Sequence, residues 1–579
     1  MAQKSKPQTP KKSSYRGFEG INLKKTHSGD ESIAFINNFR ITDDGSLKKR
    51  CGFQSVYESS LADASIITSH STVENGNEVC YFVEGAFIKK YDFASKAVTD
   101  IGEFENQPPN AFFFEYLDKL FICDGYNILS IENNSLTSST FYIPLYGKDW
   151  HAFAGEINEK PNLLWNKVAI SYKLPQGSTS YLSIGKLKLQ SIDALYRNGT
   201  LLSSDQYSFQ ERYNSINVPE FADNDEFLAI ITFDGDEHYK SMRNSLISSH
   251  SASVFYELNK NNLFFWGSKN HNKVFYSTSL NKENAQISAL HPDCGEFYVP
   301  LDSFFKVASE KDRINAFIRH YDRVLIMTES STWITNLQEL ENDNLKIKNI
   351  NNSIGCISKG GCVRIENTLF SIGKDAIYSW SADTDELNEC NAHNISEPIN
   401  ELLDEDFFKS CFVHLHYSER EIWFYTPSIT TVWIYNYKRK VWYSFSGFSP
   451  SSILDGGKLP CFLESTTLYA FNSALQSDIK NNTSVQISAS LTSGELEFNS
   501  KQKKKLYSST IRGSISGGSI KLRITLDNKK TLLYNISPSA YHSVIPFRTK
   551  SGSFKSLKFV LTATGEGTQI IHGIELEAD

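Results

Sequence analysis

Short apolar strands separated by tight polar turns recur along the chain and are its dominant pattern. In each copy, an apolar strand is followed by a polar or Gly turn and then by a second strand that carries an aromatic residue. Seven copies occur, at 81–91, 120–131, 263–277, 324–334, 369–380, 422–437 and 461–471. Adjacent copies are about 40–50 residues apart, which is the blade period of a β-propeller. The pattern therefore predicts an all-β chain built on a β-propeller of six to eight blades; repeated hairpins in a plain sandwich are the alternative.

The period is interrupted once, between the second and third copies. The interruption contains apolar segments at 166–184, 192–202 and 227–233, and the first of these is expected to form two strands around a Pro/Gly turn. The second contains Asn198-Gly199, a strong hairpin turn. Because the ends of a loop already lie close together, a loop tolerates an inserted domain. We therefore expect a small β-sandwich at 155–250, inserted into a propeller that comprises 17–154 and 251–475.

A second change of pattern begins near residue 476. Alternating apolar and polar residues predict strands at 485–491, 494–498, 509–515, 519–527, 553–564 and 569–578. These strands predict a C-terminal antiparallel β-sandwich over 476–579. One helix is predicted at 394–410, where Ser396 precedes Glu397-Pro398 and apolar residues follow at roughly helical spacing.

Composition agrees with a β-rich protein that does not grip nucleic acid over its whole surface. Aromatic residues make up 13% of the chain, which suits pleated, half-buried surfaces. The net charge is −7. An acidic wall repels phosphates, so this charge is compatible with a surface that DNA slides past. The nine cysteines are irregularly spaced and form no CxxC, so we expect reduced core residues. No secretory signal and no apolar stretch of 18 residues is seen.

Three basic stretches are candidate contact sites. Residues 1–16 are predicted to be a flexible basic arm, either a disordered terminus or an arm that docks on a neighbouring subunit or on DNA. The other two stretches are either solubilising surface or contacts to subunits or phosphates. The candidate residues are Lys4, Lys6, Lys11, Lys12, Lys48, Lys49, Arg50, Lys503, Lys504 and Lys505.

The sequence predicts no catalytic centre, metal site or cofactor site. Acidic pairs at 221–227, 233–238 and 402–407 are close in sequence, but glycosidases need two carboxylates across a cleft, so turns and a helix end are the simpler interpretation. Asp223 with Asp225, or Asp234 with Asp236, could hold calcium, yet neither pair continues into a complete loop motif. His414 and His416 alternate along a strand and share one face, without a third ligand that the sequence identifies. No nucleophile elbow, zincin motif, P-loop or GxGxxG is present.

Segment 15–53 provides a resemblance to a known family. It contains Phe18-x-Gly20-Ile21-Asn22, followed by Gly45-x-Leu47-x-x-Arg50-x-Gly52-Phe53. This order resembles the opening of the tail nozzle proteins of short-tailed bacteriophages, also called tail tubular protein B, and is similar to the packaged-DNA stabilisation proteins. The family usually has Pro where this chain has Cys51. Segments 261–279 and 420–445 resemble two later blades of the family, the second through Trp423, Tyr425, Ile434, Tyr435, Asn436, Tyr437 and Trp442.

The resemblance implies a structural virion protein of a phage tail, made in the host cytoplasm. Identical subunits, six in the resembling family, would form a ring below the portal and head–tail adaptor proteins and above tail-fibre or tail-tip proteins. Genomic double-stranded DNA would be retained by this ring and then conducted through it. Two other classes remain open: a propeller-type receptor-binding or glycan-degrading tail-tip protein, and a cytoplasmic propeller scaffold without a viral role.

Overall fold

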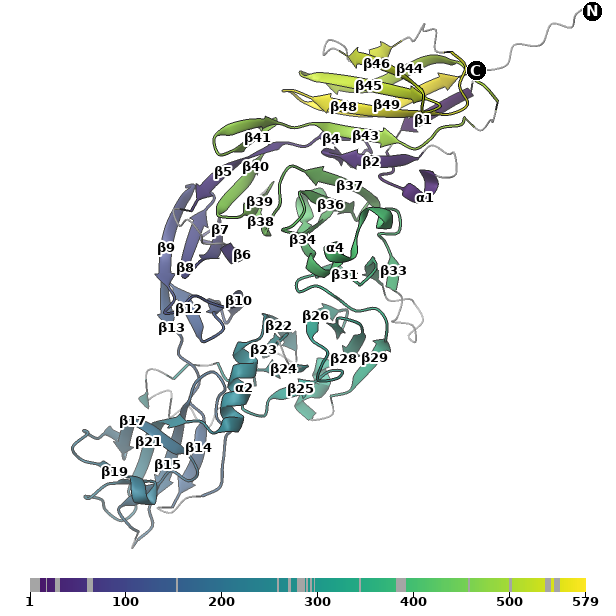
Figure 1. The fold of residues 1–579 in the computed structure, drawn as a ribbon. Coiled ribbons are helices and arrows are strands. Elements are labelled where there is room, and N and C mark those ends of the chain that lie inside the picture. Colours follow the sequence, from purple (N-terminus) through teal and green to yellow (C-terminus); the bar gives the residue numbers. More distant parts are fainter. Residues whose placement is uncertain are drawn as a thin grey trace, which may run out of the picture. The chain divides into compact units, whose positions relative to one another are not determined.

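The chain is built almost entirely from antiparallel β-sheets (Figure 1). In the computed structural model, the described residues are 11–578 apart from 17, 27–31, 60–65, 152–154, 177, 258–259, 269–271, 279–286, 288–289, 292–293, 296, 343–344, 382–391, 457–458, 499–501, 537–542 and 546–551. The chain divides into two compact units. Unit 1 comprises Met1–Gly85, Lys89–Thr99 and Asn351–Asp579, and unit 2 comprises Ala86–Ile88 and Asp100–Ile350.

Seven groups of four antiparallel strands follow one another along the chain and are the blades of a β-propeller; five are separate sheets, and two are parts of larger sheets. Three blades belong to unit 2. Blade 2 contains β10 (Phe112–Tyr116), β11 (Lys119–Cys123), β12 (Ile128–Glu132) and β13 (Ser135–Ser138). Blade 3 contains β22 (Ser251–Glu257), β23 (Lys260–Trp266), β24 (Lys273–Tyr276) and β25 (Phe304–Lys306). Blade 4 contains β26 (Ile314–His320), β27 (Arg323–Thr328), β28 (Thr332–Thr335) and β29 (Ile347–Asn351). The first strands of these blades contact one another, β10 with β22 and β22 with β26.

The other four blades belong to unit 1, apart from a few residues of blade 1. Blade 1 contains β6 (Ile66–Glu74), β7 (Asn77–Glu84), β8 (Phe87–Asp92) and β9 (Ala97–Glu103). Blade 5 contains β30 (Cys362–Ile365), β31 (Thr368–Ile372), β32 (Ile377–Trp380) and β33 (Ala392–Asn394). Blade 6 contains β34 (Phe412–His416), β35 (Glu421–Tyr425), β36 (Thr431–Asn436) and β37 (Val441–Ser446). Blade 7 contains β38 (Ser452–Gly456), β39 (Leu459–Glu464), β40 (Thr467–Asn472) and the N-terminal strand β5 (Gly52–Glu58).

The predicted propeller is confirmed, and its hairpins are the second and third strands of the seven blades. β5 pairs antiparallel with β40, so that Phe53 lies opposite Phe471 and the start of the chain completes the last blade. This pairing satisfies the outer edge of β40, which would otherwise be open.

The C-terminal sandwich also contains N-terminal strands. One of its sheets holds β44 (Leu506–Ile515), β49 (Gln569–Ala578) and β47 (Ser543–Ile545), together with β1 (Lys11–Arg16), β3 (Phe39–Ile41) and β4 (Leu47–Lys49). The other holds β43 (Ala489–Ser493), β48 (Leu557–Thr564), β45 (Ser519–Leu526) and β46 (Lys530–Ile536), together with β2 (Ile33–Asn37). The assignment of 11–49 to an arm and to the propeller is therefore corrected: β1, β2 and β4 pair with strands from the far end of the chain, and β3 pairs with β4.

Two sheets run without interruption from the propeller into this C-terminal region. In the first, β37 of blade 6 meets β2 at Asn37, and β2 pairs antiparallel with β43 of the sandwich (Figure 1). In the second, β5 of blade 7 meets β41 (Ser477–Lys480), which forms a hairpin with β42 (Thr483–Gln486). Unit 1 is thus held together by backbone hydrogen bonds as well as by side-chain packing.

The domain inserted into unit 2 contains two sheets and a helix. Its larger sheet has the order β14 (Leu145–Trp150), β15 (Lys167–Lys173), β21 (Glu226–Asp234), β17 (Lys188–Arg197) and β18 (Thr200–Leu201). The smaller sheet has the order β16 (Tyr181–Ser183), β20 (Ser215–Asn217) and β19 (Ser208–Gln210). The domain begins at β14, before the predicted boundary. The segment 166–184 is not a hairpin, because β15 pairs with β14 and β21 whereas β16 pairs with β20. The predicted Asn198-Gly199 turn is confirmed, and both residues have positive φ.

The helices differ from the predicted ones. The predicted helix at 394–410 is reduced to a 3-10 turn at Asn400–Leu402 and to α4 (Glu405–Ser410). Ser396 does not cap a helix: its hydroxyl accepts a hydrogen bond from the amide of Ile377, and α4 is capped by Asp404. A helix that was not predicted, α2 (Glu237–Ile247), begins where Asp236 accepts a hydrogen bond from the amide of Tyr239.

Candidate functional site

The signature segment near the N-terminus lies where blade 6, blade 7 and the C-terminal sandwich meet, so we consider this junction the candidate site. Gly20 has a φ of 78°, and a Cβ atom there would lie 2.8 Å from the backbone N and O of Trp442. Its neighbour Ile21 donates a backbone hydrogen bond of 2.9 Å to the carbonyl of Trp442. The segment therefore lies against the backbone of β37, at a distance that only glycine permits.

Arg50 is the central side chain of the junction and is 4% exposed. Its two terminal nitrogens each lie 2.7 Å from an oxygen of Asp478 in β41, which makes a bidentate ion pair. The guanidinium also donates to Asn38 Oδ1 (2.8 Å) and to the carbonyls of Cys51 (3.0 Å) and Ser446 (2.8 Å). All five of its N–H groups are thus used, and this side chain, which directly follows β4, contacts β37 and β41.

An aromatic cluster packs beside this ion pair. The ring of Phe53 makes edge contacts with Phe448, Phe462, Tyr469 and Phe471, at centroid distances of 4.9–5.6 Å. The preceding Gly52 has no room for a side chain, because a Cβ atom would lie 1.9 Å from the carbonyl oxygen of Ser477. Gly52 and Phe53 therefore have packing roles in β5, the strand that completes blade 7.

A buried carboxylate forms a second link between the N-terminal strands and blade 6. Glu421 in β35 is fully buried, and its carboxylate lies 2.7 Å from Arg40 Nε of β3. It also accepts hydrogen bonds from Trp423 Nε1 (2.8 Å) and from the hydroxyl of Tyr443. Burial raises the pKa of Glu421, although Arg40 opposes the shift. The Glu421 network therefore has a structural role, because it holds β3 against blade 6.

The predicted basic contact residues have different positions in the structure. Lys4 and Lys6 lie outside the described residues, and the arm is described only from Lys11 and Lys12, which belong to β1. Lys48, Lys503 and Lys505 are exposed.

Three of the predicted contact residues are corrected to interior positions. Besides Arg50, Lys49 is 4% exposed and donates to the carbonyl of Gly565. Lys504 is 3% exposed and donates to the carbonyls of Gln502 (3.0 Å) and Lys555 (2.8 Å). Their charged groups are used within the chain.

The acidic stretches that the sequence offered as calcium or acid–base candidates have structural partners. Asp225 pairs with Arg197 at 2.6 Å, and Asp234 pairs with Lys188 (2.7 Å) and Lys240 (2.9 Å). Asp236 and Asp404 cap helices. Among the described residues, no group of three or more His, Cys, Asp or Glu side chains is placed to hold a metal ion.

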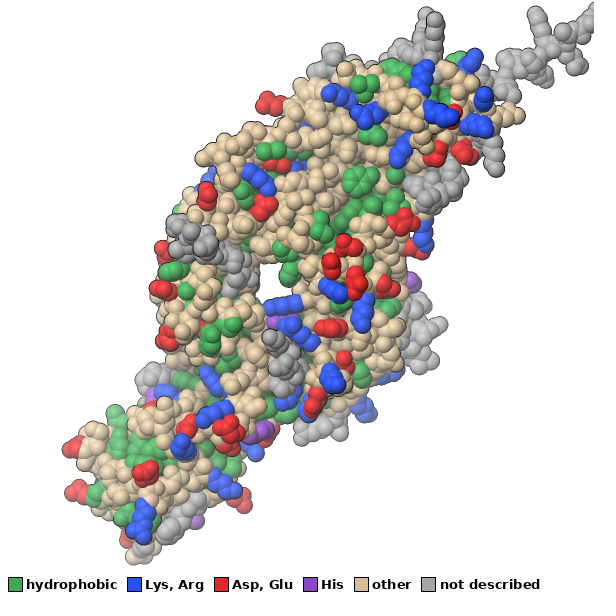
Figure 2. Space-filling model, viewed as in Figure 1, with side chains coloured by type: hydrophobic (Ala, Val, Ile, Leu, Met, Phe, Trp, Pro, Cys, Tyr) green, Lys and Arg blue, Asp and Glu red, His purple; other side chains and the backbone are tan. Residues whose placement is uncertain are grey.

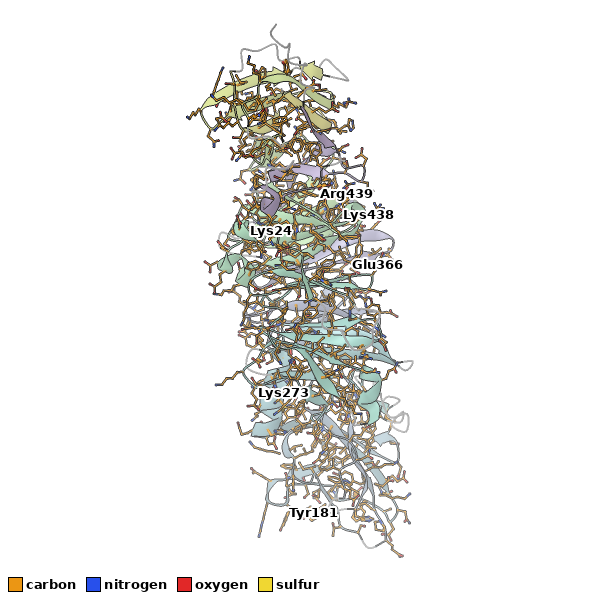
Figure 3. The ribbon with its side chains drawn as sticks, turned by 90° about the vertical axis from the view of Figure 1, so that its right-hand side faces the viewer. Lys24, Tyr181, Lys273, Glu366, Lys438 and Arg439 are labelled. Carbon is orange, nitrogen blue, oxygen red and sulfur yellow. The ribbon has the colours of Figure 1, made fainter. Side chains whose placement is uncertain are left out.

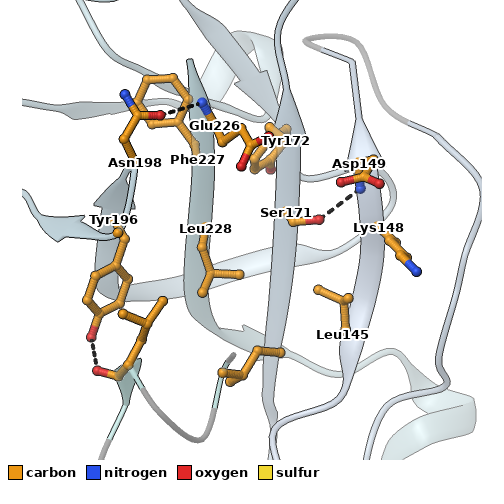
Figure 4. Close-up of a pocket in the computed structure, with 13 residues that line it drawn as sticks. Leu145, Lys148, Asp149, Ser171, Tyr172, Tyr196, Asn198, Glu226, Phe227 and Leu228 are labelled. Atoms are coloured by element: carbon orange, nitrogen blue, oxygen red, sulfur yellow. Dashed lines mark hydrogen bonds between the residues drawn. The ribbon is translucent and has the colours of Figure 1, made fainter. Parts of the chain in front are cut away.

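A cavity of about 430 Å³ lies beside the larger sheet of the inserted domain (Figure 4). Its apolar wall includes Leu145 and Leu228, and its polar rim includes Asp149 and Glu226. The backbone amides of both acidic residues donate to neighbouring side chains, Asp149 to Ser171 Oγ (2.8 Å) and Glu226 to Asn198 Oδ1 (3.0 Å). The Glu226 carboxylate lies 3.4 Å from Lys173. The cavity has the size and lining for a small amphipathic ligand. Sequence reasoning did not identify it, because its lining comes from four strands and from Ile287 and Leu290.

No family model and no curated protein matches the chain. Solved structures similar to the chain include the AfRom2 CNH domain (6% identity, 72% of this chain and 98% of the other, TM-score 0.35). Others are the Neurospora crassa Pan2 WD40 domain (8% identity, 74% and 97%, TM-score 0.34) and the Phanerochaete chrysosporium exo-beta-1,3-galactanase (10% identity, 75% and 99%, TM-score 0.22). Over the described residues, no helix is long and apolar enough to cross a membrane. The identities and TM-scores are too low to transfer any activity to this chain.

Proposed function

We propose that this chain is a structural subunit of a bacteriophage tail, which assembles with identical copies into a ring-shaped nozzle that retains packaged DNA and conducts it during ejection. The observation that carries this proposal is the junction of unit 1. There the phage-like segment 15–53 joins the propeller to the C-terminal sandwich through two continuous sheets and the Arg50–Asp478 pair.

The construction of the junction suits a part that must resist force. Each of the two sheets crosses from the propeller into the C-terminal region through one parallel residue pair, Asn37 with Ser444 and Gln54 with Ile479. The buried ion pair and the aromatic cluster around Phe53 add geometric constraint at the same place. A subunit that holds pressurised DNA benefits from such stiffness, whereas an enzyme that must open and close needs a hinge.

In the proposed assembly, the ring contains about six copies, with adaptor and portal proteins above it and fibre or tip proteins below it. The duplex passes through the centre. Net charge supports this arrangement: the chain carries −7, and a wall of the same sign as the phosphates does not slow the passage of DNA by binding it.

Deletion of the gene from the phage tests the proposal. We expect heads that package DNA and then lose it, which is measured as genomic DNA that becomes sensitive to nuclease after packaging. A plasmid copy of the gene should restore normal retention. Particles that retain their DNA without this chain would contradict the proposal. Release of reducing sugars from host-surface glycans by the purified protein would instead favour the tail-tip, glycan-degrading alternative.

A further inference from the structure

The C-terminal sandwich has a charge opposite to that of the rest of the chain. Residues 489–579 contain thirteen Lys and Arg against seven Asp and Glu, a net charge of +6. Since the whole chain carries −7, residues 1–488 carry −13. Figure 2 shows Lys and Arg side chains gathered over the C-terminal domain at the top of the view. One protein therefore presents a basic region and an acidic remainder.

Three of these basic residues lie on one face of the sheet β43-β48-β45-β46. Side chains alternate between the two faces of a strand, so the buried positions identify the inner face. Ile520, Leu522 and Ile524 of β45 are buried, which places Lys521 and Arg523 on the outer face. Arg523 is paired with Val560 of β48, so Lys558, two residues before Val560, shares that face.

The rest of this face is neutral. It carries no Asp or Glu: its other residues are Ser490 and Thr492 of β43, Val560, Thr562 and Thr564 of β48, Ser519 and Thr525 of β45, and Thr531, Leu533 and Asn535 of β46. Leu533 is 58% exposed, so this face remains open to solvent at β46. We call this surface the basic face.

On the basic face, Lys521, Arg523 and Lys558 are exposed and make no ion pair with any described residue. Elsewhere, many basic side chains have an acidic partner, such as Lys188 with Asp234 and Lys119 with Glu132. Like charges placed together on a flat surface repel one another, and a complementary negative surface removes that cost.

We propose that the basic face binds the acidic surface of a second copy of this chain and forms the contact between neighbouring subunits of the ring. This inference rests on the proposed function. A ring needs two different, complementary surfaces on each subunit, because its contacts are head-to-tail. The chain supplies both signs of charge, +6 over residues 489–579 and −13 over residues 1–488. Duplex DNA is the competing polyanion, but the acidic remainder of the subunit repels it.

Charge reversal in the full-length protein tests the assignment. The variant is K521E/R523E/K558E, and the matched control is K311E/K374E/K438E, which makes the same change in net charge at exposed lysines of the blades (Lys438 is labelled in Figure 3). Sedimentation velocity at about 50 mM and about 500 mM salt measures association, and electron microscopy shows whether rings form. A gel-shift assay with random duplex DNA is run in parallel.

We expect the wild type and the control to associate at low salt and to weaken at least ~10-fold at high salt, and the basic-face variant to remain monomeric in both. Rings that form equally well from the basic-face variant would overturn the surface assignment and leave the proposed function intact. A wild type that stays monomeric, or a basic face whose reversal abolishes only DNA binding, would also overturn the assignment. Failure of the proposed function is detected separately, by normal DNA retention in the deletion particles.

Discussion

Removal of the Arg50 guanidinium is the perturbation with the clearest expected size. In R50M, the Asp478 carboxylate, which is 5% exposed, stays buried without its counter-ion. Breaking a buried pair from one side costs about 3–5 kcal/mol, because the remaining charge is uncompensated. The Asn38 side chain and two backbone carbonyls lose donors as well, so we expect the upper half of this range.

Hydrogen exchange measures this loss where it occurs. The chain has several domains, and a single global unfolding free energy is therefore a poor measure of one junction. Since about 1.4 kcal/mol is a factor of ten in an equilibrium constant, a loss of ~4 kcal/mol speeds the opening-limited exchange of amides in β5 and β41 by roughly 700-fold. Peptides covering the inserted domain should keep their wild-type exchange rates.

A matched surface pair provides the control. Arg512 lies 3.4 Å from Glu575 with its side chain 49% exposed, and R512M should cost at most ~1 kcal/mol. The double variant R50M/D478L should regain part of the loss, because it leaves no buried charge. If R50M and R512M change the exchange of β5 and β41 by similar factors, Arg50 does not hold the junction together and the reasoning is refuted.

Three further predictions concern single positions. G52A should lower the melting temperature by several degrees, because the new Cβ atom would lie 1.9 Å from the Ser477 carbonyl oxygen. The control G76A places its Cβ atom within 4 Å of no other atom and should cost only the ~1 kcal/mol of its positive φ. Differential scanning calorimetry compares the two variants. Two lysine ammonium groups lower the pKa of Asp234 to about 2. Its stabilising effect is therefore complete above the unfolded-state pKa of about 4 and is lost as the pH falls toward 2. In urea titrations from pH 5 to pH 2, the free energy of unfolding should depend less steeply on pH for D234N than for wild type. D236A should destabilise α2 by ~1 kcal/mol and D236N by much less, measured as hydrogen exchange of helix amides; equal losses would exclude a capping role.

The repeated elements could be predicted from the sequence because each is a local pattern. The seven hairpins and the Asn198-Gly199 turn depend on residues within about fifteen positions of one another, and all were found. α2 was missed although a signal existed: Asp236 stands before Tyr239, Met242 and Leu246, but the acidic run 233–238 was interpreted as a turn.

Partner choice over long distances could not be predicted. The strand β1 pairs with residues 573–578, and nothing near Lys11 indicates which of the many strands it joins. Arg50 shows the same limit for the candidate site. The run Lys48-Lys49-Arg50 has the composition of a solvated surface, and only the fold brings Asp478 to it from 428 positions away. The basic face around Lys521 and Arg523 can likewise be recognised only when the strand register is known.

Imaging of whole phage particles with this subunit labelled tests the central claim most directly. We expect the label in a ring on the tail axis, with about six copies around a passage wide enough for duplex DNA. A label on peripheral fibres, on the capsid surface or in the infected cell but not in the particle would contradict it.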